Sequence, residues 1–145
     1  MKVFLATPIS TFREQDDFLK YRRSVVKLVS ILRKEHSITC EIDEIGGKGS
    51  YDSPVESFTK DFSAIKSSDC FILHYPNPSP TSALIELGFA IALEKKVIIV
   101  TPDKQQLPYL VQSIEKVGTN YSVIENRSLG KTTTKRIIDI LAEPL

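Results

Sequence analysis

The sequence of 145 residues contains only two cysteines and two histidines, which limits its metal and redox chemistry. Cys40 and Cys70 both fall within short apolar runs, where a cysteine is typically a buried, reduced thiol. His36 and His74 lie far apart and are not accompanied by cysteines at a metal-ligand spacing. We therefore expect no metal site and no bound cofactor.

An excess of either charge sign is also lacking, since 19 Lys and Arg residues against 18 Asp and Glu residues give a net charge of +1. A nearly neutral chain has no electrostatic reason to bind nucleic acid or an anionic membrane. The apolar stretch at residues 1–6 is too short for a signal peptide. The apolar stretch around residue 86 is shorter than the roughly 20 residues that span a bilayer. We expect a soluble, cytoplasmic protein with no nucleic-acid or membrane partner.

What the sequence does contain is a regular alternation of short apolar runs and longer amphipathic ones. Runs typical of β-strands lie at residues 3–6, 38–42, 70–75, 97–101 and 121–124. Helical spacing of apolar residues is found at residues 12–34, 54–67, 81–94, 105–116 and 131–141. The length fits one domain, residues 1–145, with a single core.

Strands that alternate with helices predict an α/β fold, with a parallel sheet covered by helices on both faces. Five strands in this order favour a flavodoxin-like, doubly wound sheet with strand order 2-1-3-4-5. In such sheets a ligand binds beyond the carboxyl ends of the strands, at the point where the strand order reverses. The segments that leave the first and third strands, residues 7–11 and 75–82, are therefore the expected walls of a ligand cleft.

Glu86 is the only Asp, Glu, Lys or Arg between Asp69 and Glu94. Its predicted helix is otherwise apolar, and a charge there is costly to desolvate unless it has a partner or a function. Helical spacing places Ala83 and Ala90 beside it, which leaves room for a ligand or for a helix of another subunit. From the residues alone, Glu86 is either a nucleophile or charge stabiliser, or else a salt-bridge partner or a carboxylate favoured by the helix dipole.

Asp61 is a second acidic candidate. It lies at the edge of the apolar stripe of its predicted helix, from which it can reach the sheet. The alternative is an exposed ion pair with Lys60 or Lys66. Asp69 precedes the third strand at the end opposite the expected cleft, where a turn or capping role is expected.

Hydroxyl and aromatic side chains also flank the expected cleft. Ser79, Thr81 and Ser82 stand where a helix begins, so they either cap that helix or form an anion site. His74 and Tyr75 end the third strand and either line the pocket or pack at its rim. A second set of hydroxyls follows the first strand, namely Thr7, Ser10 and Thr11.

Several common site patterns are missing. The run Gly-Gly-Lys-Gly-Ser at residues 46–50 looks like a phosphate loop, but the Walker pattern needs a glycine where Ile42 stands. We interpret this run as a mobile loop or lid. The third strand ends in His-Tyr-Pro, without the Asp of a receiver domain, and no Ser-His-Asp or Cys-His order is present.

Three segments together resemble the nucleoside 2-deoxyribosyltransferase family, which includes the deoxynucleoside 5′-monophosphate N-glycosidases. Val-Phe-Leu-Ala-Thr-Pro at residues 3–8 resembles the first strand of that family, written Y-L-A-G-P. Asp61, Ile65 and Asp69 match its D-x-x-x-I-x-x-x-D element. Residues 82–96 match its E-L-G-x-A-x-A helix, which is followed by a lysine and an apolar strand.

This resemblance implies an enzyme that cleaves or transfers the N-glycosidic bond of a nucleoside or nucleoside 5′-monophosphate. It implies that Glu86 attacks the anomeric carbon, as the nucleophile of a retaining glycosidase does, and that Asp61 positions the sugar or assists the leaving base. It also implies a homodimer or higher homo-oligomer, and the two apolar faces of the helix at 81–94 independently indicate an interface. The substrate-binding residues expected at the cleft are Ala6, Thr7, Pro8, Ser10, His74, Tyr75, Ser79 and Ser82.

Two other functions stay open from the sequence. A TIR-like NAD-cleaving domain also carries a helix-borne Glu with a Ser a few residues ahead, as Ser82 stands to Glu86. A non-catalytic nucleotide-binding or sensing module is the other, because Phe4, Thr7 and Pro80 depart from the Tyr, Gly and Asp of the family pattern. Fold class does not decide between these functions.

Overall fold

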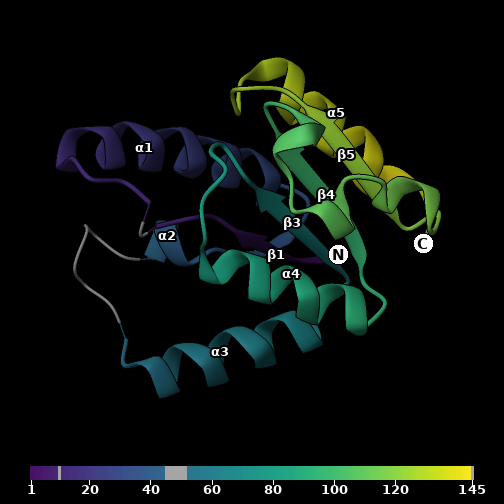
Figure 1. Ribbon diagram of the computed structural model, residues 1–145, viewed down its shortest axis with the longest axis horizontal. Helices are drawn as coiled ribbons and strands as arrows, with labels where there is room; N and C mark the ends of the chain where they lie inside the picture. The colour runs from purple at the N-terminus through teal and green to yellow at the C-terminus, as the bar shows by residue number, and fades with distance from the viewer. Residues whose placement is uncertain (10, 45–51, 145) are drawn as a thin grey trace.

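The computed structural model describes residues 1–9, 11–44 and 52–144, and in these the chain forms a five-stranded parallel sheet (Figure 1). The strands lie in the order β2-β1-β3-β4-β5, and each neighbouring pair is parallel. This confirms the predicted α/β, flavodoxin-like sheet and its strand order. The strands are β1 (Lys2–Ala6), β2 (Ser37–Thr39), β3 (Cys70–His74), β4 (Lys96–Thr101) and β5 (Tyr121–Glu125).

Helices cover both faces of the sheet. Figure 1 shows α1 (Gln15–Leu32) and α5 (Lys131–Ala142) on one face, and α3 (Pro54–Ser67) and α4 (Ser82–Ala92) on the other. A short helix, α2 (Glu41–Glu44), follows β2. Among the residues that the structure describes, no helix is both long enough and apolar enough to cross a membrane.

Successive residues of each strand enter two separate cores, because side chains alternate between the faces of a sheet. Val3, Leu5, Cys70 and Ile72 pack beneath α1 and α5, whereas Phe4, Ala6, Phe71 and Leu73 pack beneath α3 and α4. Strands buried on both faces read as continuous apolar runs, which is why the sequence shows them so clearly.

Two predicted elements are wrong in part. The strand predicted at residues 38–42 ends at Thr39, and Glu41 begins α2. Arg22 of α1 holds this short helix, because its guanidinium donates to the carbonyl oxygens of Ile42 at 3.0 Å and of Asp43 at 3.1 Å. These contacts are tertiary, so no local pattern announces them.

The helix predicted at residues 105–116 is instead three 3-10 turns, η1 (Lys104–Gln106), η2 (Tyr109–Val111) and η3 (Ile114–Lys116). Pro108 explains the difference, since proline has no N–H to donate and disfavours the helical conformation of the residue before it. Leu107, Val111 and Ile114 still pack into the core beside α4.

Candidate active site

A cavity of about 200 Å³ lies where the strand order reverses. Four segments converge on it, because β1 and β2 end there and α3 and α4 pass beside it. A second hollow of about 360 Å³ adjoins the first and shares Ser57, Asp61, Ser82 and Glu86 with it. The lining residues of the first cavity are Thr7, Ile9, Glu41, Ser57, Asp61, Thr81, Ser82, Ala83 and Glu86.

Glu86 is an acid of this cavity with a strongly perturbed pKa. Its pKa is raised to about 8, first because burial disfavours the carboxylate, and then because Asp61 and Glu41 carry like charges nearby. Perturbed acids in a cleft are typical of catalytic sites. A ligand that brings or develops positive charge here favours ionisation of Glu86, since it offsets both the repulsion and the lost hydration.

Asp61 is positioned by the packing of α3 against α4. The ring of Phe62 meets that of Phe89 edge-on at 5.1 Å, and Phe58 meets the same ring at 5.6 Å. Ser57 lies one helical turn before Asp61, so both side chains face the cavity from α3. Of the two lysines named as alternative partners, Lys60 lies 3.7 Å from the carboxylate of Asp52.

The start of α4 places two hydroxyls at the cavity. Thr81 is the N-cap, and its Oγ1 accepts a hydrogen bond from the backbone N–H of Ala83 at 3.4 Å. Ser82 is exposed and lines both hollows. Capping by Thr81 therefore leaves Ser82 directed at the space beside Glu86.

His74 and Tyr75 lie away from these hollows. His74 is buried on the α1 side, where its Nδ1 lies 2.7 Å from the hydroxyl of Tyr21 and the two rings stack. Burial lowers the pKa of His74 to about 4, so the ring is neutral at physiological pH. Tyr75 is buried on the α4 side, and its hydroxyl bonds both the backbone N–H and the carbonyl of Ser79.

The structure thus divides the residues predicted from the sequence. Glu86, Asp61, Thr7 and Ser82 come together around one cavity. Ser10 and the glycine-rich run at 46–50 lie outside the described residues. Predicted residues that are not among the described lining of either hollow are Ala6, Pro8, His74, Tyr75 and Ser79.

Sequence reasoning missed two polar residues that line the first cavity, Glu41 and Ser57. Glu41 was hidden because residues 38–42 read as one strand, which placed this acid inside the strand and not at its carboxyl end. Ser57 carries a usable signal, since it precedes Asp61 by four residues on the same predicted helix.

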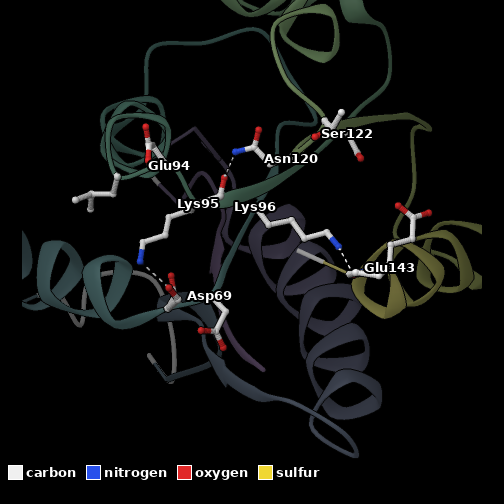
Figure 2. Close-up of a pocket in the computed structure, with 11 residues that line it drawn as sticks. Asp69, Glu94, Lys95, Lys96, Asn120, Ser122 and Glu143 are labelled. Carbon is white, nitrogen blue, oxygen red and sulfur yellow. Dashed lines mark hydrogen bonds between the residues drawn. The ribbon is translucent and has the colours of Figure 1, made fainter.

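A larger hollow of about 720 Å³ lies at the opposite end of the sheet, at the amino ends of β3, β4 and β5 (Figure 2). Its two lysines are engaged with backbone oxygens. Lys95 Nζ donates to the carbonyls of Lys66 and Ser68. Lys96 Nζ donates to the carbonyl of Glu143 (Figure 2). These hydrogen bonds hold neighbouring segments of the chain together, which is a structural role. We therefore place the candidate active site at the carboxyl ends of the strands, in the cavity that contains Glu86.

Asp69 belongs to this opposite end. Its carboxylate accepts a hydrogen bond of 2.7 Å from the backbone N–H of Lys2, the first residue of β1. A turn or capping role is predicted for Asp69; in the structure its side chain links the start of β3 to the start of β1 through this hydrogen bond. Of the two acids in the D-x-x-x-I-x-x-x-D element, Asp61 is the one that lines the cavity.

The described part of the chain contains no set of side chains arranged as metal ligands. Among those residues, no group of three or more His, Cys, Asp or Glu side chains is arranged to hold a metal ion. The acids of the cavity, Glu41, Asp61 and Glu86, do not form such a group. Among the described lining residues, the polar side chains carry carboxyl and hydroxyl groups.

Comparison of the sequence with protein families finds one family model that matches most of the chain. The family model of nucleoside 2-deoxyribosyltransferase matches residues 3–131. No curated protein is similar enough in sequence to count as a match.

Solved structures share the fold at low sequence identity. The CMP N-glycosidase BcmB of Clostridium botulinum superposes with a TM-score of 0.72 at 22% identity, over 95% of this chain and 98% of that one. A conserved protein of Enterococcus faecalis V583 gives 0.65 at 17% identity, over 96% and 98%. A 2-deoxyribosyltransferase of Leishmania mexicana gives 0.51 at 19% identity, over 70% of this chain and 65% of that one.

Proposed function

Because this chain belongs to the nucleoside 2-deoxyribosyltransferase family, we propose that it cleaves or transfers the N-glycosidic bond of a nucleoside or nucleoside 5′-monophosphate. Glu86 is the nucleophile in this proposal. The observation that carries it is the position of Glu86, a partly buried carboxyl group inside the cavity at the reversal of strand order, with Asp61 beside it. Ligands of open α/β sheets bind at this point.

The chemistry follows from the charges around the cavity. A carboxylate oxygen of Glu86 attacks the anomeric carbon, the bond to the base breaks, and a glycosyl ester forms. Water, or a second base, then attacks the same carbon and releases Glu86. The transition state carries positive charge on the sugar, and the acids around the cavity stabilise that charge electrostatically.

The functional groups of the other lining residues indicate how each would bind the substrate. Asp61 faces the cavity from α3 and orients the sugar through its hydroxyl groups. Thr7 and Ser82 supply hydroxyls from the ends of β1 and α4, and these bind the sugar or its 5′ substituent. Backbone N–H groups at the start of α4 add a site favourable to an anion such as a phosphate.

Release of free base is the direct test. The wild type is incubated with a panel of nucleosides and monophosphates, beginning with CMP because the Clostridium botulinum neighbour is a CMP N-glycosidase. We expect the Glu86→Gln variant to lose on the order of 10³-fold or more in rate, as nucleophile variants do. Glu94→Gln is the matched control, since Glu94 is exposed and lies just beyond the C-terminal end of α4.

Two results would contradict the proposal. Equal base release by wild type and Glu86→Gln rules out the assigned nucleophile. Release of nicotinamide from NAD, without release of base from any nucleoside or monophosphate, points to a TIR-like activity instead.

We also propose that the protein is a homodimer or higher homo-oligomer that buries α3 and α4. Val55, Phe58 and Ile85 are 76%, 59% and 60% exposed, and they lie on these two neighbouring helices beside the cavity. Exposed apolar patches next to a site mark interaction surfaces. Ile85→Arg should shift the solution mass to that of one chain, whereas Val117→Arg, at an equally exposed position outside α3 and α4, should not. A wild type that is monomeric at all concentrations contradicts the assembly.

The cytoplasm is the location we propose for this activity. Cys40 and Cys70 are both buried and neither forms a disulfide bond in the described part of the chain, as expected in a reducing compartment. Fractionation of cells that carry the tagged protein tests this location directly.

A further inference from the structure

Glu41 reaches the cavity from the side opposite to Glu86. It follows β2, whereas Glu86 lies on the helix that follows β3, and β1 stands between these two strands in the sheet. Thr7 and Ile9, which continue from β1, line the cavity between them. Asp61 shares the side of Glu86, because α3 packs directly against α4.

The stereochemistry of substitution at the anomeric carbon indicates on which side of the cavity the leaving base lies. In a displacement at the anomeric carbon, the nucleophile approaches one face of the sugar while the leaving group departs from the other. With Glu86 as nucleophile, the departing base therefore points away from α4. Glu41 stands on that side of the cavity, so its carboxyl group faces the base.

Glu41 is held in place by contacts of α2 with α1. Ile42, the next residue, is fully buried, and Arg22 donates to the carbonyls of Ile42 and Asp43. The carboxylate of Asp43 forms a 2.7 Å ion pair with Arg33. A catalytic group works best when neighbouring contacts fix its orientation, and these contacts do so for Glu41.

We propose that Glu41 is the general acid that protonates the departing base. As the Glu86 oxygen bonds to the anomeric carbon, the bond to the base nitrogen breaks and that nitrogen takes the proton of Glu41. The Glu41 carboxylate then accepts a proton from the water that attacks the glycosyl ester, which restores both groups. This inference rests on the proposed nucleophilic role of Glu86.

Repulsion among the acids supports such a division of labour. Glu41, Asp61 from α3 and Glu86 from α4 interact across one cavity, so ionising all of them together is unfavourable. Where two carboxyl groups share a site, one retains a proton and acts as the acid. Without a ligand that proton resides on Glu86, whose pKa is raised to about 8. The productive arrangement has the proton on Glu41 and the negative charge on Glu86, and the positive charge that develops on the sugar beside Glu86 favours it.

The experiment compares two leaving groups. One is the base of the best substrate found in the panel, and the other is the same base alkylated at a ring nitrogen. The alkylated base is already cationic and leaves as a neutral molecule, so it needs no proton. The rates of base release are measured for wild type, Glu41→Gln, Glu41→Asp and Asp43→Asn.

We expect Glu41→Gln to slow release of the ordinary base by about 10²–10⁴-fold, the usual contribution of a general acid, and release of the alkylated base by less than about tenfold. Glu41→Asp keeps a carboxyl group and should recover part of the lost rate. Asp43→Asn loses the ion pair with Arg33 without removing an acid from the cavity, so any effect should be equal for both leaving groups.

Four results would overturn the inference. Equal losses on both leaving groups mean that Glu41 acts through structure alone, and unchanged rates mean that it has no role. If Glu41→Gln is poorly folded, absence of any recovery in a folded Glu41→Asp protein overturns the assignment. No base release by the wild type contradicts the proposed function itself, and with it the role of Glu41.

Discussion

At the scale of single residues, the shifted pKa of Glu86 makes the free energy of folding depend on pH. The folded protein raises the pKa of Glu86 to about 8, from 4.5 for an unperturbed glutamate. Between these two values the folded chain holds a proton that the unfolded chain has released. Folding therefore becomes less favourable as pH rises through this interval, and the contribution of Glu86 is constant above it.

The first prediction concerns stability. Glu86→Gln carries no charge at any pH, so it should be more stable than wild type at pH 8 and close to wild type at pH 4.5 or below. The difference at pH 8 should be on the order of a few kcal/mol. Urea unfolding of both proteins across this range measures it, and a difference that does not change with pH contradicts the raised pKa.

The second prediction concerns catalysis. If ionised Glu86 is the nucleophile, kcat/KM of the wild type should rise with pH by up to about tenfold per unit as Glu86 ionises, and it should fall again at higher pH once Glu41 has lost the proton that it gives to the base. Asp61→Asn removes one like charge, so the rise should move to lower pH. The apparent pKa belongs to the interacting acids together, and an unmoved profile in Asp61→Asn would separate Asp61 from the site.

The sequence revealed some of these residues and concealed others for physical reasons. Glu86 stood out because it is a lone charge in an apolar helix, and Asp61 because it matches a known spacing. Glu41 has ordinary neighbours in sequence, and its significance comes only from the tertiary position of β2. His74 looked like a cleft residue because it ends β3, but its place in the pleat turns it toward α1.

At the scale of elements, the orientation of α3 governs the position of Asp61. Its N-terminus is closed by a capping box, in which Ser53 Oγ accepts from the backbone N–H of Glu56 while the Glu56 carboxylate accepts from that of Ser53. Pro54 at the first helical position adds a fixed backbone angle.

The third prediction tests this cap. Ser53→Ala removes the side-chain acceptor and should lower the free energy of unfolding by about 1 kcal/mol. Ser67→Ala near the other end of α3 removes only a hydroxyl that bonds the carbonyl of Ala64, and should change it by less than about 0.5 kcal/mol. Thermal or urea unfolding compares the two variants, and equal losses contradict a specific capping contribution.

Most elements could be predicted because their signals are local. Strands buried on both faces gave continuous apolar runs, and α1, α3 and α5 showed helical periodicity. The segment at 105–116 also shows this periodicity, but Pro108 interrupts the hydrogen bonding of a helix. The chain forms 3-10 turns there instead, and Leu107 and Val111 still pack into the core. Periodicity reports which residues are buried more reliably than it reports the backbone that buries them.

At the scale of the whole molecule, the reversal of strand order assembles the cavity. Glu41, Asp61 and Glu86 come from different elements and meet because β1 lies between β2 and β3. The sequence predicted this meeting place, since the alternation of strands and helices fixes where such a sheet reverses.

The fourth prediction uses Gly88 to detect assembly. Gly88 is exposed on α4, and a Cβ atom added there would meet no atom of the same chain within 4 Å. In an isolated chain, Gly88→Ala should stabilise the helix by about 1 kcal/mol. If subunits pack through α4, the added methyl group lies in the interface, and the variant should instead dissociate at higher protein concentration than wild type. Sedimentation combined with unfolding distinguishes these outcomes, and stabilisation without a change in assembly contradicts the α4 interface.

The nucleophilic role of Glu86 is tested most directly by trapping the glycosyl-enzyme. The protein is quenched in acid during turnover of its best substrate, digested, and examined by peptide mass spectrometry. We predict a mass increase equal to the glycosyl group on the peptide that contains Glu86, and its absence in Glu86→Gln. Base release accompanied by an adduct on a different residue would contradict the account.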